Sequence, residues 1–305
     1  MPRVSVIIPT FNRADLIRVA IESVLAQTYR DFEIIVADDG STDQTAEVIA
    51  QFGDAVTYLP LPHRGQPAAT RNGGLRIARG EFAAFLDSDD LFFPHKLALQ
   101  AAALEAHPEV GMIYSNGRFF RDDPDQPTGH VQDGLPTPSG QIFADLLRGN
   151  MLAPAVVLIR RLCLDRVGPF DEQPDFCAVE DFDLWLRIAA EFPVLYVPGD
   201  VAAIRRHSHS ISRDVAVLRS RALKVIVKAE ALYPDLMRQY RAAHHEGYAR
   251  THGAVAAAEL KQGHLAAGLK HSLQALAHAL QIPGLGLGGF TAWLARRRLR
   301  QGARS

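Results

Sequence analysis

Three aspartates within four residues, Asp87, Asp89 and Asp90, are the side chains best suited to chemistry. In an extended segment residues two apart face the same side, which predicts that Asp87 and Asp89 converge while Asp90 is turned away or begins the next connection. Two carboxylates held together repel, and a cation relieves that repulsion. Without thiolate or imidazole neighbours, such oxygens favour Mg2+ or Mn2+, which would bridge a diphosphate and stabilise it as a leaving group. The alternative is a turn, where Asp is also common.

A second acidic cluster begins the run from Asp38 to Asp43, which also contains Ser41 and Thr42. Ser41 or Thr42 is expected to cap the helix that follows, with Asp43 against its positive end. Asp38 and the neighbouring Asp39 are not needed for that cap. A carboxylate there would accept a hydrogen bond from a nucleobase or a ribose hydroxyl.

Four further side chains are candidates by type and position. The donor fork of Arg71 suits a phosphate, although a lone Arg on a helix is often a solvated surface residue. Glu180 and Asp181 precede a predicted helix, where a carboxylate acts either as a general base for an acceptor hydroxyl or as a cap. His207 would complete the coordination of a metal or contact a phosphate. The alternative is a structural role, which is more common for a single His.

The elements that must position these residues alternate along the chain. Strands are predicted at 4–9, 32–37, 56–61, 82–86, 112–115, 155–159, 194–197 and 201–205. Helices are predicted after a cap at Asn12 and over 42–52, 67–79 and 182–190. Strands that are apolar on both faces and alternate with helices predict an α/β fold whose mostly parallel sheet is covered on both sides. Ligands collect at the carboxyl ends of such strands, where both acidic clusters stand.

The chain changes character in two places. The polar stretch over 121–140, rich in Asp, Pro and Gly, predicts a mobile loop near the site. After about residue 213 the strand signals stop, which divides the chain into a catalytic domain over 1–215 and a helical region over 216–305. Residues 251–281 predict two helices broken near Gly263 that pack together through an apolar face. That face comprises Ala257, Leu260, Leu265, Leu269, Leu273, Leu276 and Leu280.

The last residues combine an apolar, Gly-rich stretch over 282–294 with Arg296, Arg297, Arg298 and Arg300. This stretch is too short to cross a bilayer. It is expected either to lie on an anionic membrane surface or to form a solvated basic tail, and the sequence favours neither.

Composition excludes several classes of protein. The 33 basic and 34 acidic residues nearly cancel, which argues against a general nucleic-acid binder. Hydrophobic residues form 48% of the 305 residues, enough for a sizeable core. The two cysteines, Cys163 and Cys177, indicate neither a zinc site nor a disulfide framework. With no signal-peptide pattern and no membrane-spanning apolar stretch, a cytoplasmic location is expected, peripheral to the inner face of the cell membrane if the tail binds lipid.

Four blocks of sequence together resemble glycosyltransferase family 2. They are Val4-Ser-Val-Ile-Ile-Pro-Thr-Phe-Asn-Arg13, Asp38-Asp-Gly-Ser-Thr-Asp43, Arg71-Asn-Gly-Gly followed by Phe85-Leu-Asp-Ser-Asp-Asp90, and Glu180-Asp-Phe-Asp-Leu-Trp-Leu-Arg187. They occur in the family's order and cover about residues 3 to 213. The resemblance implies a GT-A fold, a nucleotide-diphosphate sugar donor, a divalent metal and inversion at the anomeric carbon.

The same resemblance implies a role for each block. Asp39, with Asp38 beside it, would contact the base and ribose of the donor. The full set implied in donor binding is Pro9, Thr10, Phe11, Asp38, Asp39, Arg71, Asp87 and Ser88. The set implied in holding Mn2+ or Mg2+ is Asp87, Asp89, Asp90 and His207. Asp181 matches the catalytic base, and Glu180 would position it or the acceptor.

These assignments imply transfer of a sugar to a hydroxyl of a glycan or a lipid-linked acceptor, in cell-surface polysaccharide or lipopolysaccharide synthesis. The Gln-x-x-Arg-Trp block of processive members is absent, which favours transfer of one or a few sugars. A sugar nucleotidyltransferase would need a Gly-rich loop where this chain has Pro9-Thr-Phe-Asn-Arg13. A non-catalytic carbohydrate-binding or scaffold subunit of a polysaccharide complex would be expected to have lost the Asp-x-Asp element or the base, and both are intact.

Overall fold

The computed structural model describes residues 1–206 and 215–282. The chain forms two compact units, one made of Met1–Phe143 and Met151–Ile211, the other of Ala144–Asn150 and the residues from Ser212 onward. Ala144–Asn150 therefore groups with the helical unit although it lies within the first half of the chain. Inside that unit the backbone approaches closely, because a Cβ added at Gly247 would lie 2.1 Å from the carbonyl oxygen of Leu147.

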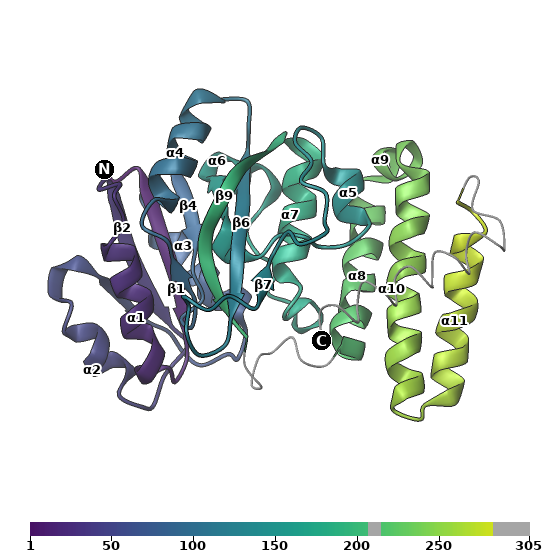
Figure 1. Ribbon diagram of the computed structural model, residues 1–305, viewed down its shortest axis with the longest axis horizontal. Coiled ribbons are helices and arrows are strands. Elements are labelled where there is room, and N and C mark those ends of the chain that lie inside the picture. The colour runs from purple at the N-terminus through teal and green to yellow at the C-terminus, as the bar shows by residue number, and fades with distance from the viewer. Residues whose placement is uncertain (207–214, 283–305) are drawn as a thin grey trace. The chain divides into compact units, whose positions relative to one another are not determined.

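The first unit is built on a nine-stranded sheet with the order β3-β2-β1-β4-β8-β6-β9-β5, in which β7 pairs with β6 (Figure 1). The strands are β1 Val4–Thr10, β2 Phe32–Asp38, β3 Thr57–Pro60, β4 Phe82–Phe85, β5 Leu91–Phe92, β6 Met112–Phe120, β7 Gly129–His130, β8 Val157–Arg160 and β9 Val194–Arg205. β1 to β4 pair in parallel, whereas β8 runs antiparallel to both β4 and β6. The predicted α/β class is confirmed, but the sheet is mixed.

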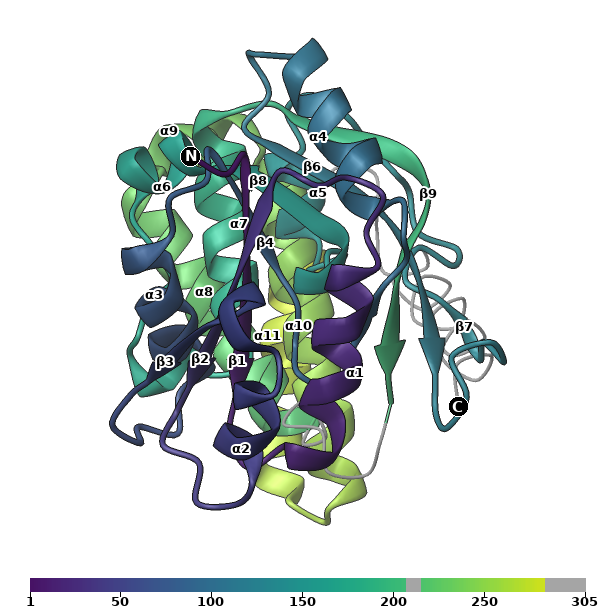
Figure 2. The same ribbon diagram turned by 90° about the vertical axis from the view of Figure 1, so that its left-hand side faces the viewer.

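Helices cover both faces of this sheet, as Figure 2 shows. α1, α2 and α4 lie on one face, and α3, α6 and α7 lie on the other. Their bounds are α1 Ala14–Leu25, α2 Thr45–Ala50, α3 Pro67–Ile77, α4 Lys96–Ala106, α6 Arg161–Val167 and α7 Glu180–Glu191, while α5 Phe143–Leu147 is a short helix outside these layers. Phe85, Phe170 and Trp185 pack ring against ring, with centroids 5.1 to 6.4 Å apart, and this buried cluster fixes α7 against the end of β4.

Two stretches of the first unit differ from expectation. β9 is one continuous strand where two were predicted, and irregularities in its register with β6 lie between Tyr114 and Arg118. The stretch over 121–140 is anchored rather than a free loop: it contains β7, the Tyr114 hydroxyl donates to Pro138 O at 2.7 Å, and Gly140 bridges to Val194.

The second unit contains α8 Val215–Leu232, α9 Pro234–Gln239, α10 Arg241–Lys261 and α11 Leu265–Ala279. α10 packs against α8 and α11, and the break at Gly263, where φ is +85°, confirms the predicted helical pair. Of the predicted apolar face, Leu260 in α10 lies against Gly268 of α11. The prediction is wrong for the leucines of α11, because Leu265, Leu269, Leu273 and Leu280 are exposed, and smaller and aromatic side chains fill the space between the two helices. No helix in the described part of the chain is long and apolar enough to cross a bilayer.

Candidate active site

The carboxyl ends of β1, β2 and β4 meet at one edge of the sheet. Thr10 is paired in register with Asp38, and Leu86 N donates to Ile7 O at 3.1 Å. Because these strands are parallel, the chain leaves each of them on the same side. The two acidic clusters therefore lie at the same edge, as the sequence predicted.

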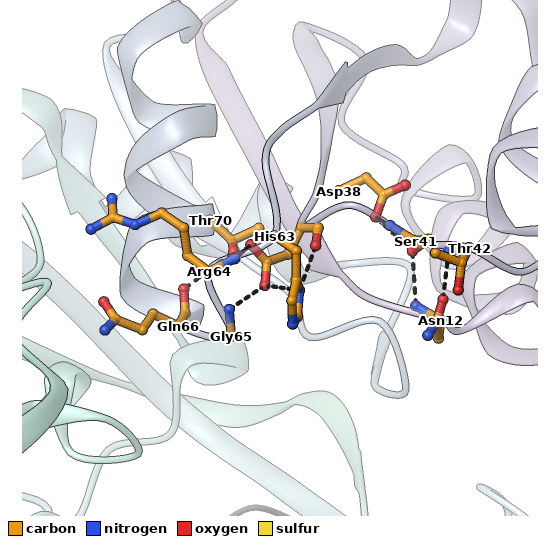
Figure 3. A network of polar contacts seen from close by, with 10 residues as sticks. Asn12, Asp38, Ser41, Thr42, His63, Arg64, Gly65, Gln66 and Thr70 are labelled. Atoms are coloured by element: carbon orange, nitrogen blue, oxygen red, sulfur yellow. Dashed lines mark hydrogen bonds and ion pairs between the residues drawn. The ribbon is translucent and has the colours of Figure 1, made fainter.

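The loops after β1 and β2 are locked together by side chains (Figure 3). Asn12 Oδ1 accepts from Thr42 N at 2.8 Å, and Asn12 N donates to Ser41 Oγ at 2.8 Å. Ser41 Oγ in turn donates to Asp38 Oδ1 at 2.6 Å, while the Tyr58 hydroxyl donates to Asp38 Oδ2 at 2.7 Å. Burial, followed by this bond to Asp38, raises the pKa of Tyr58 to about 12. Asn12, Ser41 and Thr42 thus join two loops and cap no helix, which corrects their predicted roles.

The first amides of the helix after β1 are satisfied from the neighbouring loop instead. α1 and α2 begin after Arg13 and Gln44, and neither of these side chains makes a cap hydrogen bond. Asp43 Oδ2 accepts from Ala14 N at 3.2 Å, and Thr45 Oγ1 accepts from Arg13 N at 3.0 Å. Partners that are about thirty residues apart are invisible to capping rules, which compare close neighbours in sequence.

Asp39 organises the segment between β3 and α3. Its Oδ1 accepts from Arg64 N at 2.9 Å, and its Oδ2 accepts from Gly65 N at 2.8 Å (Figure 3). His63 Nδ1 lies 2.8 Å from Asp39 O, and the His63 ring stacks on the ring of Phe11 at 4.2 Å. Phe11 is 40% exposed, so a flat ring stands open beside the strand ends.

Arg71 joins the second acidic cluster to α7. Its Nη2 donates to Asp87 Oδ1 and its Nη1 to Glu180 Oε1, both at 2.6 Å, and its guanidinium lies 5.6 Å from the Phe170 ring. Burial alone would lower the pKa of Arg71, but Asp87 and Glu180 raise it above its ordinary value. The guanidinium is therefore charged, and both of its terminal nitrogens are engaged with carboxylates.

Asp181 lies beside this buried pair, in the first turn of α7. The residue before the helix is Val179, so Asp181 is not its cap, and its Oδ1 accepts from Phe182 N at 2.7 Å. Of the three carboxylates in that turn, Glu180 is paired with Arg71 and Asp183 with Arg187, and both are buried. Asp181 is the carboxylate of this turn that solvent partly reaches.

The segment from Asp87 to Asp90 is a turn, in which Asp90 N donates to Asp87 O at 3.0 Å. Asp87 and Asp89 are partly exposed, whereas Asp90 is buried and accepts from Arg205 N at 2.8 Å. Burial, and next the charges of Asp87 and Asp89, raise the pKa of Asp90 well above its ordinary value. As predicted, Asp90 differs from its two neighbours: it begins the connection to β5, and its carboxyl is buried against the backbone of Arg205.

Several buried polar atoms at this edge have no hydrogen-bond partner within the described ranges. They are Thr10 Oγ1, Gln66 Oε1, Arg71 Nε and Glu180 Oε2. Buried polar atoms are nearly always paired, so such a group is expected where a bound molecule supplies partners. Gln66, like His63 and Arg64, was not a candidate from sequence. Its signal would have been its place after β3, a third parallel strand that ends at the same edge.

Residues 5–161 match the family model described as Glycosyl transferase family 2. The chain belongs to this family. A glycosyltransferase of Rickettsia felis with no assigned substrate is 33% identical over 211 residues, which are 67% of this chain and 33% of that protein. The Escherichia coli UDP-Glc:alpha-D-GlcNAc-diphosphoundecaprenol beta-1,3-glucosyltransferase WfaP is 33% identical over 192 residues, which are 63% of this chain and 72% of WfaP. The chain spans about a third of the length of the Rickettsia relative.

Solved structures show the same fold as this family 2 glycosyltransferase. S. aureus TarS 1-349 in complex with UDP-GlcNAc aligns over 89% of both chains, with a TM-score of 0.62 and 18% identity. The mannosyltransferase PcManGT from Pyrobaculum calidifontis in complex with GDP-Man and Mn2+ aligns over 99% of this chain and 82% of that one, with a TM-score of 0.63 and 22% identity. These similarities confirm the predicted GT-A fold.

The sheet edge with the acidic turn after β4 offers carboxylate ligands to a divalent cation in this glycosyltransferase. In residues 1–206 and 215–282 no group of three His, Cys, Asp or Glu side chains is arranged to hold a metal by itself. His207 lies outside the described residues. Asp87 and Asp89 nevertheless fit a cation that takes further oxygen ligands from a bound diphosphate, because both carboxylates are partly exposed in one turn and Mg2+ and Mn2+ prefer oxygen ligands.

The described site residues thus form two connected groups in this glycosyltransferase. The first comprises Pro9, Thr10, Phe11, Asp38 and Asp39 at the ends of β1 and β2. The second comprises Arg71, Asp87, Ser88, Asp89, Asp90, Glu180 and Asp181, linked through the Arg71 ion pairs. β1 lies between β2 and β4 in the sheet, so the two groups are neighbours along one edge.

Proposed function

We propose that this family 2 glycosyltransferase moves a sugar from a nucleotide-diphosphate donor, with inversion, to a hydroxyl of a glycan or lipid-linked acceptor. One observation carries the proposal. Arg71 binds Asp87 and Glu180 at 2.6 Å each, which sets the acidic turn after β4 beside Asp181. This arrangement supports a leaving-group site and a general base at one sheet edge, as a single displacement would require.

The donor is proposed to lie along the ends of β1 and β2. The unpaired Thr10 Oγ1 and Gln66 Oε1 offer one donor-acceptor group and one acceptor, and the exposed Phe11 ring offers a stacking surface for a base. Asp38 and Asp39 shape the loops. Asp38 Oδ2 accepts from the Tyr58 hydroxyl and Asp39 Oδ1 from Arg64 N, and each of these two oxygens has a second lone pair for a ribose hydroxyl or a base. Pro9 and Ser88 are proposed to contribute the adjoining walls.

Arg71 is proposed to position other residues rather than to bind phosphate directly. Its terminal nitrogens already donate to Asp87 and Glu180. A buried cation between two carboxylates holds both at fixed places, and its loss would leave them repelling each other. Glu180, whose Oε2 has no partner among the described atoms, is proposed to position Asp181 or the acceptor.

In the proposed reaction the Asp181 carboxylate takes the proton of the acceptor hydroxyl. The freed oxygen attacks the anomeric carbon from the face opposite the diphosphate, and the bond from that carbon to the phosphate oxygen breaks with its electron pair remaining on the leaving nucleoside diphosphate. No covalent enzyme intermediate forms. Mn2+ or Mg2+ held by Asp87 and Asp89, with Asp90 and His207 as further proposed ligands, would neutralise charge on the departing diphosphate.

The acceptor is proposed to be lipid-linked. WfaP and WfgD of Escherichia coli are both named as glucosyltransferases for alpha-D-GlcNAc-diphosphoundecaprenol, and they are 33% and 31% identical to this chain. Such an acceptor would set the enzyme in cell-surface polysaccharide or lipopolysaccharide synthesis. It would also place the enzyme in the cytoplasm, peripheral to the inner face of the membrane.

A donor panel tests the proposal directly. UDP-Glc, UDP-GlcNAc and GDP-Man are incubated with the full chain, with and without Mn2+, and nucleoside diphosphate release is measured. Release from one donor that rises with Mn2+ is expected. Donor binding without release would favour a non-catalytic subunit, and consumption of a nucleoside triphosphate with a sugar phosphate would favour a nucleotidyltransferase. Either result contradicts the proposal.

A further inference from the structure

α11 carries an exposed stripe of leucines. Leu265, Leu269, Leu273 and Leu280 are 70%, 61%, 59% and 55% exposed, and Leu276 is partly exposed. At about 100° per residue, these five positions span roughly 80° of the helix surface. They form one continuous apolar face rather than scattered side chains.

The opposite face of α11 is polar or small, although it is the face that packs against α10. His271 lies 2.9 Å from His252, and His278 lies 3.1 Å from His245, each distance joining the two Nδ1 atoms. Tyr248 stacks on His278 at 4.5 Å. The remaining space is closed by the buried residues Gly268, Ala275 and Ala279.

This arrangement reverses the usual amphipathic helix, in which the apolar stripe faces the core. Burying a Leu side chain contributes more than burying Ala, so a helix that buries alanines and exposes leucines leaves that contribution unused. Contiguous exposed apolar patches of this kind mark interaction surfaces. The leucine face is therefore expected to have a partner outside the described residues.

Charge identifies the chemistry of that partner. Over residues 260–282 the sequence contains no Asp or Glu, and its formal charges are those of Lys261 and Lys270. Lys261 and Lys270 are exposed, and Lys270 borders the leucine stripe. The last carboxylate before this region, Glu259, accepts a hydrogen bond from His264 at 2.8 Å. An apolar stripe on a helix whose one formal charge is the cation Lys270 fits the surface of an anionic bilayer, where leucines enter the acyl-chain boundary and lysine meets the headgroups.

We propose that the leucine face of α11 binds the surface of an anionic phospholipid membrane. The contact would hold the enzyme at the membrane, where a lipid-linked acceptor is found. Only the choice of that acceptor rests on the proposed function. The face belongs to a folded helix and is distinct from the basic tail over 283–305.

Vesicle binding by the full chain tests this proposal. Vesicles of equal parts phosphatidylglycerol and phosphatidylcholine are spun down with wild type and with the double variant Leu269→Glu, Leu273→Glu. Wild type is expected to co-sediment, and the variant to bind at least about tenfold more weakly, because two leucines leave the interface and two anions enter it. The neutral variant Leu269→Gln, Leu273→Gln is expected to bind more weakly than wild type as well, which separates lost apolar contact from charge repulsion.

A matched control adds the same two charges elsewhere. Leu162 in α6 and Val19 in α1 are 61% and 45% exposed, and the double variant Leu162→Glu, Val19→Glu is expected to bind vesicles as wild type does. Equal binding by wild type and the Leu269, Leu273 variants overturns the proposal. So does a wild-type dimer that ignores vesicles and becomes monomeric in those variants by sedimentation equilibrium, because the leucine face would then bind a second copy.

Sugar transfer to a water-soluble acceptor is measured on the same proteins. It distinguishes failure of the membrane-binding proposal from failure of the proposed function. Lost vesicle binding with unchanged soluble transfer supports the membrane surface. Absence of transfer from wild type would contradict the proposed function and leave the vesicle result standing by itself.

Discussion

Arg71 and Glu180 form a buried ion pair in which Nη1 lies 2.6 Å from Oε1 and both side chains are 5% exposed. The other terminal nitrogen of Arg71 holds Asp87, whose side chain is 37% exposed. One cation therefore serves a carboxylate inside the protein and another that reaches the site. We expect both the stability of the fold and the position of the acidic turn to depend on this cation.

Replacing this cation should expose that dependence. Arg71→Met is expected to lower the free energy of unfolding by about 3–5 kcal/mol, because Glu180 stays buried without its partner. Urea unfolding measures the loss, and Arg76→Met on the exposed face of the same helix is the control. The double variant Arg71→Met, Glu180→Gln should recover part of the stability. An unchanged midpoint for Arg71→Met would show that the ion pair contributes nothing.

The general base is tested by Asp181→Asn, which keeps the shape of the side chain and removes its basicity. Turnover is expected to fall at least ~10²-fold while donor affinity stays nearly constant. Steady-state kinetics and donor titration measure the two effects separately, with Asp165→Asn in α6 as an exposed control. Full activity in Asp181→Asn would remove this residue from the mechanism.

Metal removal addresses the turn after β4. Chelation is expected to reduce sugar transfer at least about 10²-fold, and added Mn2+ or Mg2+ to restore it, because the cation offsets charge on the leaving diphosphate. Asp89→Asn should require more metal for half-maximal activity. A control shows that the chelator removes Mn2+ from a reference protein. If sugar transfer is then unchanged by the chelator, the proposed metal site is contradicted.

The helical unit should lose stability in acid. Burial, and next His271 and His278, lower the pKa of His252 to about 4, so this side chain stays neutral in the fold while the unfolded chain takes up a proton near pH 6.5. Between these values the unfolded state binds more protons, and stability falls as pH drops from about 6.5 to about 4, by up to about 1.4 kcal/mol per pH unit for each such histidine. The titratable and charged groups around this cluster include His244, His245, Tyr248, Glu230, Arg241, Glu259 and Lys270.

Urea unfolding followed by circular dichroism at several pH values checks this slope. The double variant His252→Gln, His271→Gln should flatten it, because two of the histidines that resist protonation are gone. A slope that is unchanged by the double variant would place the acid sensitivity elsewhere.

Deleting residues 282–305 tests the basic tail independently of α11. Co-sedimentation with anionic vesicles is expected to weaken at least about tenfold, since each Arg near such a surface contributes roughly 1 kcal/mol. Binding should persist in part, because the leucine face remains. Unchanged co-sedimentation would favour a solvated tail.

Much of the fold follows from local pattern. The β-branched runs at Val4 and Phe32 and the strand at Phe82 are predicted within a residue or two, because both faces of these strands are buried. Neither a helix nor a strand was predicted between residues 87 and 111, yet β5 and α4 lie there. The order of β8, β6 and β9 depends on pairing between distant segments, which periodicity does not encode.

In the candidate site, too, local features were predictable from sequence and long-range partners were not. The positions of the acidic residues at strand ends were predictable, since strand ends are visible in sequence. Their partners were not: Arg71 finds Glu180 at a separation of 109 residues, and Asp43 finds Ala14 in a neighbouring loop. The leucines of α11 were wrongly assigned to the helix interface because leucine is usually buried, whereas here histidine and alanine fill that space.

The seating of Ala144–Asn150 against Gly247 has a practical consequence for dissecting the enzyme. Because this short stretch precedes β8 and β9 in the chain yet groups with the helical unit, no single cut in the polypeptide releases two intact halves. A protein shortened at residue 214 would leave the buried side chains of Leu146 and Leu147 stranded in water and prone to aggregate. Co-expressed fragments 1–206 and 215–305 should accordingly stay associated until a denaturant is added.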